Sequence, residues 1–130
     1  MPNFIKDANV ATLVFLYTNF HSINQHFIDG SFDEGLALIP DIEKQLSKYE
    51  SRIDPHHKMI FYYKFASLYF GAGYNKKSIE YLGKIISNKS LSMREDLLCF
   101  SRVLNLVAHY EAGLDYHLEA LLRSTYKFLI

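Results

Sequence analysis

The chain of 130 residues has one cysteine, no tryptophan, three prolines and six glycines. The single thiol of Cys99 cannot form an internal disulfide, so we expect a reducing compartment, the cytoplasm. Because Cys99 lies in an apolar run, we interpret it as a small hydrophobic side chain rather than a nucleophile. With 49% apolar residues the chain is not typical of disorder, and residues 1–130 are predicted to form a single domain.

Net charge is also missing, since 14 Lys and Arg balance 14 Asp and Glu. Nucleic-acid binding needs several cations on one face, so a nucleic acid is a poor candidate partner. A polybasic membrane contact is disfavoured for the same reason. The apolar patch within residues 1–20 is too short to span a bilayer and lacks a basic leader region and a cleavage site. Neither a membrane span nor a signal peptide is predicted.

Motifs for catalysis, metal binding and cofactor binding are lacking too. His21 and His26 are five residues apart and do not share a helix face well, and neither H-E-x-x-H nor C-x-x-C occurs. The stretch Gly71–Gly73 lacks the lysine and the following Ser or Thr of a phosphate loop. We therefore predict no enzymatic activity, no metal and no cofactor.

What the chain does have is helical periodicity throughout. Apolar residues recur in steps of three and four over the first helix, which predicts one buried face: Leu13, Leu16, Phe20, Ile23 and Phe27. Gly30 is available as its left-handed cap. Ser31 and Glu34 form a capping box for a second helix that reaches about Tyr49. Pro40 predicts a kink near Leu36 to Pro40, with a complete break as the alternative.

Four more helix starts follow in the same way. Asp54 and Pro55 predict an N-cap with proline at the first helical position. Asn75 is predicted to cap the next helix, Ser92 and Glu95 to form a second capping box, and Asp115 to cap the last helix. Six helices in three antiparallel pairs, without strands, are the result.

Three glycines place these pairs in a common register: Gly30, Gly73 and Gly113. Three residues before each glycine stands an aromatic, and ten before it another apolar residue: Phe27, Phe70, Tyr110 and Phe20, Tyr63, Val103. One helix–turn–helix unit therefore occurs three times, over about 10–50, 55–88 and 92–130. Stacking such units buries a continuous core that one unit alone cannot provide.

The middle unit resembles a tetratricopeptide repeat in seven positions: Tyr62, Phe65, Ala66, Tyr69, Gly73, Ser78 and Leu82. The first and third units match weakly, Ser90 stands where that family has a proline, and the glycine spacings of 43 and 40 exceed the usual repeat of about 34. The segment 93–129 also resembles helical-repeat proteins of bacteria. The resemblance implies an all-α, right-handed α-α superhelix of about three TPR-like hairpins.

Such a fold implies a protein-binding scaffold or adaptor that holds a peptide or protein in a concave groove. We place the groove at five residues: Tyr62, Tyr69, Arg102, Asn105 and His109. The alternative is that the two tyrosines belong to the core and the polar stripe is ordinary surface. A small-molecule or nucleic-acid binder on the same surface is the second candidate function.

The chain ends on the apolar stretch YKFLI without a polar cap. Terminal helices of a repeat stack normally present a polar outer face. Two explanations are open: the chain is part of a longer array, which we prefer, or its last helix packs against another molecule. Self-association through this apolar C-terminal helix is one form of the second explanation.

Overall fold

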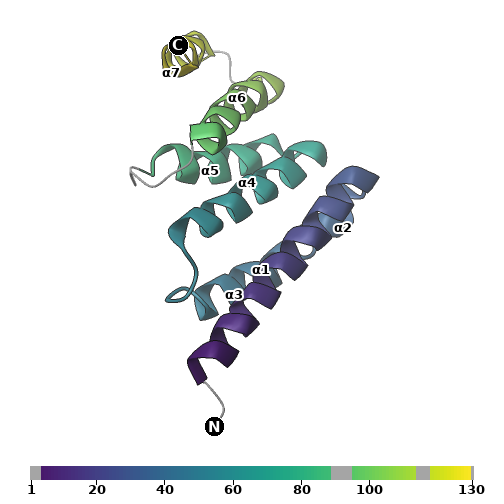
Figure 1. The fold of residues 1–130 in the computed structure, drawn as a ribbon. Helices are drawn as coiled ribbons and strands as arrows, with labels where there is room; N and C mark the ends of the chain where they lie inside the picture. Colours follow the sequence, from purple (N-terminus) through teal and green to yellow (C-terminus); the bar gives the residue numbers. More distant parts are fainter. Residues whose placement is uncertain (1–3, 89–94, 114–117, 130) are drawn as a thin grey trace.

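The computed structural model describes residues 4–88, 95–113 and 118–129, and this part of the chain contains only helices and turns (Figure 1). The helices are α1 (Phe4–Asp29), α2 (Phe32–Leu36), α3 (Ile39–Lys48), α4 (Pro55–Gly71), α5 (Asn75–Ile86), α6 (Glu95–Glu111) and α7 (Leu118–Leu129). The predicted all-α class is confirmed. None of the helices described is long and apolar enough to cross a membrane.

The three glycines of the sequence register all adopt the left-handed conformation that only glycine takes at little cost. Their φ angles are 71° at Gly30, 89° at Gly73 and 73° at Gly113. At the first two, the next backbone N–H donates to the carbonyl five residues earlier, Ser31 to His26 at 3.0 Å and Tyr74 to Tyr69 at 2.8 Å. This pattern closes a helix with a Schellman turn. The same corner therefore follows α1 and α4, and the predicted glycine cap is confirmed.

The start of the second helix differs from the prediction. Ser31 is the N-cap residue of α2, but its side chain makes no capping hydrogen bond. Its Oγ instead lies 2.9 Å from Nδ1 of His26, so the predicted capping box with Glu34 is wrong. The turn that closes α1 brings His26 beside Ser31, and the Ser31 hydroxyl contacts the His26 ring instead of capping α2. Near Pro40 the alternative holds: the helix breaks after Leu36, and α3 begins at Ile39.

The later helix starts agree with the sequence in part. Asp54 caps α4 by accepting a hydrogen bond from the backbone N–H of His56 at 3.0 Å, with Pro55 as the first helical residue. The prediction for α5 is wrong by one residue, because Tyr74 is the N-cap and Asn75 is already helical. The predicted caps at Ser92 and Asp115 lie outside the described residues.

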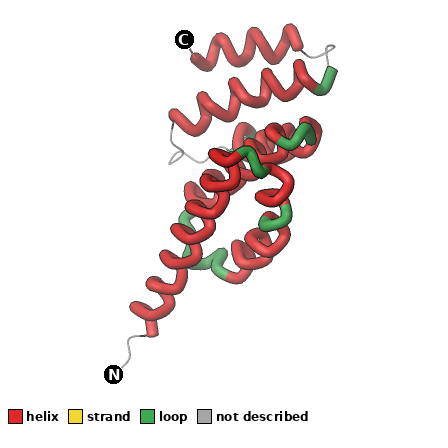
Figure 2. The backbone as a smooth tube through the Cα atoms, turned by 90° about the vertical axis from the view of Figure 1, so that its right-hand side faces the viewer, coloured by secondary structure: helices red, strands yellow, loops and turns green. Residues whose placement is uncertain are grey.

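The core is centred on α4 and α5. Phe61, Phe65, Ala66 and Leu68 on α4 have no exposed area, and neither has Leu82 on α5. Helix α5 also packs against α6, while α1 contacts α2 and α4. In both views the α6–α7 pair lies at one end of the molecule, and the N-terminal part of α1 projects at the other (Figure 1, Figure 2).

Helix α1 buries a different side from the predicted one. Leu16 and Ile23 are buried as expected, but Leu13 and Phe27 each remain 49% exposed, so their predicted burial is wrong. Thr12 and Phe15 are buried in their place. The helix is apolar around most of its circumference, so its own periodicity does not determine which side meets α2 and α4. The side that the core leaves open is apolar as well.

Candidate functional site

A stripe of exposed apolar side chains runs along α6. Phe100 is 58% exposed, Val103 43%, Val107 39% and Tyr110 64%. Steps of three and four residues place these side chains on one side of a helix, since each residue turns the helix by about 100°. A neighbouring side of α6 carries the buried Leu97, Ser101 and Ala108, so the apolar surface of this helix extends from the core to the outside.

Helix α1 has a matching stripe. Counted back from its closing glycine, Tyr17 and Phe27 of α1 occupy the positions of Phe100 and Tyr110 on α6. Tyr17 is 65% exposed, and Val10 and Leu13 extend the same side towards the N-terminus. We name the two stripes, together with Tyr63 of α4, the first-helix face: Val10, Leu13, Tyr17, Phe27, Tyr63, Phe100, Val103, Val107 and Tyr110.

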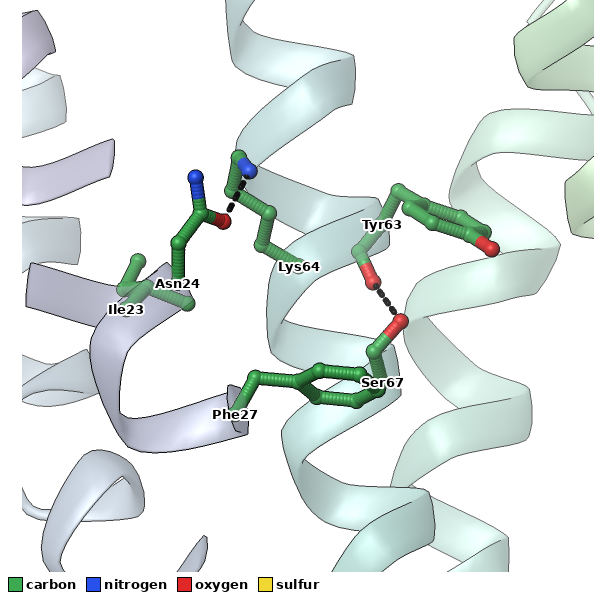
Figure 3. A pocket seen from close by; sticks show the side chains of 6 residues that line it. All are labelled: Ile23, Asn24, Phe27, Tyr63, Lys64 and Ser67. Carbon is green, nitrogen blue, oxygen red and sulfur yellow. Dashed lines mark hydrogen bonds between the residues drawn. The ribbon is translucent and has the colours of Figure 1, made fainter. Parts of the chain in front are cut away.

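Helix α4 connects the two stripes. A pocket of about 230 Å³ lies between α1 and α4, lined by Ile23, Asn24, Phe27, Tyr63, Lys64 and Ser67 (Figure 3). On the other side of α4, the ring of Tyr63 has its centroid 6.5 Å from that of Phe100 on α6. Phe27 and Tyr63 thus both border the pocket, and the ring of Tyr63 also packs near Phe100, so α4 lies between the stripes of α1 and α6.

Lys64 is the cation of this pocket. Its Nζ donates to Oδ1 of Asn24 at 2.5 Å, and the two side chains point towards one another across the pocket (Figure 3). The same Nζ lies 5.3 Å from the ring centroid of Phe20. Burial lowers the pKa of Lys64 below its usual 10.5, because desolvation disfavours the charged form.

The predicted groove residues Tyr62 and Tyr69 lie on another side of α4. Both are half-buried, and their ring centroids are 5.5 and 5.7 Å from that of Tyr81 on α5. The phenol of Tyr81 donates to the carboxylate of Glu43 on α3, so this aromatic cluster also holds α3 to α5. The two tyrosines are thus partly buried against the core between α4 and α5.

The predicted polar stripe lies beside α7. The guanidinium of Arg102 lies 4.4 Å from the ring centroid of Phe128, and its Nη1 donates to Oγ of Ser124 at 3.4 Å. Asn105 and His109 are half-buried and follow Arg102 in helical steps. The five predicted residues therefore form two groups on separate helix pairs, and partner binding by them stays a prediction.

The exposed aromatics of the first-helix face were not among the predicted groove residues. A signal for them was nevertheless present in the glycine register, where Phe27 and Tyr110 share one position and Tyr63 and Val103 another. Apolar residues at equivalent positions of a repeat are normally read as core. Only the packing of α1, α4 and α6 shows that this row is left open.

The tyrosines near α5 predict a loss of stability at alkaline pH. Burial raises the pKa of Tyr63, Tyr69 and Tyr81 above the usual 10.0, and the hydrogen bond to Glu43 adds to the shift at Tyr81. Below about pH 10 these phenols are protonated whether the chain is folded or not. Above it the unfolded chain loses their protons first, so the free energy of unfolding falls as pH rises.

Urea unfolding between pH 8 and pH 11 measures this loss. We expect the variant Tyr81→Phe to lose stability less steeply than the unchanged protein over this range. If the free energy of unfolding falls equally steeply with pH in the two proteins, Tyr81 does not contribute to the loss of stability at alkaline pH.

Within residues 4–88, 95–113 and 118–129, no three His, Cys, Asp or Glu side chains are placed to hold a metal ion. Cys99 is half-buried. No protein-family model matches the chain, and no curated protein and no solved structure is significantly similar to it. The first-helix face is therefore interpreted from its own geometry.

Proposed function

We propose that the protein is a non-catalytic interaction module, a scaffold or adaptor, that holds a segment of a partner protein on the first-helix face. The observation that carries the proposal is the two stripes of exposed aromatic and aliphatic side chains on α1 and α6, with the half-buried Tyr63 of α4 and its pocket between them. Contiguous exposed apolar surface is uncommon on a protein that stays alone, and it marks interaction sites.

The residue types of the face suit protein recognition. Tyr17 and Tyr110 combine a large apolar ring with a hydroxyl that is compatible with water, and both are nearly two-thirds exposed. Aromatic side chains of this kind provide most of the binding energy at many interfaces. The pocket beside Tyr63 offers a recess for one apolar side chain of the partner.

The proposal includes a TPR-like arrangement, a right-handed superhelix in which the first helices line the concave side. The repeated glycine corners after α1 and α4 support it. A small molecule or a nucleic acid on the same face remains the second candidate. A nucleic acid requires several cations and a steep salt dependence, whereas a protein segment on this apolar face binds with little dependence on salt.

Peptide selection tests the proposal without a known partner. The immobilised protein is used to select binders from a phage-displayed library of random peptides, and the affinities of the selected peptides are then measured. We expect Tyr110→Asp to weaken their binding about 30-fold, because losing an aromatic anchor costs about 2 kcal/mol. The matched control is Tyr126→Asp on α7, since Tyr126 is 65% exposed and Tyr110 64%.

A loss of about 30-fold in affinity with Tyr110→Asp, and a change of less than about twofold with Tyr126→Asp, would support the first-helix face. The proposal fails if the library yields no specific binders, or if their affinity is the same for both variants. Circular dichroism spectra that match the unchanged protein establish that each variant is folded.

A further inference from the structure

Lys64 borders the first-helix face at the pocket, and among the described residues no counter-ion pairs with it. Its Nζ contacts the neutral amide oxygen of Asn24 and the ring of Phe20. No carboxylate among the described residues pairs with it. The six residues that line the pocket include no Asp or Glu. The described part of the chain therefore places no negative charge against Nζ.

This arrangement is costly before a ligand binds. A half-buried ammonium group has lost part of its hydration, and the amide oxygen of Asn24 replaces only a fraction of it. A negative charge placed beside Nζ would compensate this cost. A partner that covers the pocket would remove more water from the ammonium group. Its binding free energy would become less favourable unless the partner places a negative charge beside Nζ.

Asn24 is oriented to assist an anion. A lysine ammonium only donates hydrogen bonds, so Oδ1 of Asn24 must face Nζ, as the 2.5 Å contact shows. The amide Nδ2 then points elsewhere, and Asn24 is exposed to solvent (Figure 3). Within the described part of the chain this Nδ2 donates to no acceptor. Nζ of Lys64 and Nδ2 of Asn24 are thus two donor groups on neighbouring side chains beside the pocket.

Apolar surface lies on both sides of these donors. Phe27 of α1 borders the pocket on one side, while Tyr63 and Phe100 lead from it towards α6. We propose that the partner segment carries an Asp or Glu side chain between two apolar anchors, and that this carboxylate binds Nζ of Lys64 and the amide of Asn24. The inference rests on the proposed function, because it specifies the chemistry of the segment held on the same face.

The selected peptides provide the test. We expect an Asp or Glu at a fixed distance from an aromatic or aliphatic residue in the peptides that bind the unchanged protein. Replacing that acid by Asn or Gln should weaken binding about tenfold, the effect of removing a partly desolvated charge-assisted contact. On the variant Lys64→Met, the same replacement in the peptide should change the affinity by less than about twofold.

Two further variants separate the charge from general effects. Lys64→Arg keeps the positive charge and should retain most of the preference for the acidic peptide. Lys44→Met removes an exposed lysine of α3 and should leave the preference unchanged. Loss of the preference in Lys64→Met, with retention in both controls, supports the inference.

The outcomes distinguish the two proposals. The role of Lys64 is overturned if the selected peptides are sensitive to Tyr110→Asp but show no preference for an acidic residue. It is also overturned if Lys64→Met retains that preference. In both cases the proposal that the first-helix face binds the partner still stands. Selection that yields no peptides sensitive to Tyr110→Asp refutes the proposed function, and the inference falls with it.

Discussion

Replacing Phe65 by alanine is expected to lower the free energy of unfolding by about 3–5 kcal/mol, the usual cost of removing a buried phenyl ring. Phe65 has no exposed area and stands where α4 meets α5. Its ring centroid lies 5.9 Å from that of Phe61 and 5.5 Å from that of Tyr81. The variant would leave a cavity that neighbouring rings fill only in part. Urea unfolding followed by circular dichroism measures the loss.

The matched control is Phe100→Ala, which removes the same ring from a position that is 58% exposed. We expect this variant to lose less than about 1 kcal/mol, as is usual for surface positions. Equal losses for the two variants would contradict the assignment of Phe65 to the core and Phe100 to the open face.

The second large effect is expected from Ala66→Leu. Ala66 has no exposed area, and the hydroxyl of the buried Ser78 on α5 donates to its backbone oxygen at 2.9 Å. Two small residues thus allow α4 and α5 to approach closely. A leucine at position 66 would force the helices apart or into strained side-chain conformations, and we expect a loss of about 3 kcal/mol.

Ala120→Leu on α7 provides the control, because it makes the same change at an exposed helical position. Alanine and leucine have similar helix propensities, so this variant should stay within about 0.5 kcal/mol of the unchanged protein. An Ala66→Leu variant as stable as Ala120→Leu would show that the contact between α4 and α5 has room for the larger side chain.

Local sequence signals were sufficient for most of the secondary structure. Asp54 followed by Pro55 predicted the start of α4 because the cap and the missing proline N–H require nothing beyond neighbouring residues. The left-handed glycines were predictable for the same reason. Where a residue had a competing contact, the local signal failed. Ser31 bonds with the ring of His26 instead of capping α2.

The sequence by itself therefore determined the all-α class, the glycine corners and most helix limits, whose causes lie within a few residues along the chain. The tertiary structure alone decided which apolar side of a helix is core. On α4, Tyr62 packs against Tyr81 of α5, whereas its neighbour Tyr63 packs against Phe100 of α6 and borders the pocket beside α1. Both are tyrosines on a helix that is apolar on most sides, so only the positions of α1, α5 and α6 distinguish them. The first-helix face is thus a property of packing, since burial depends on which helices lie nearby.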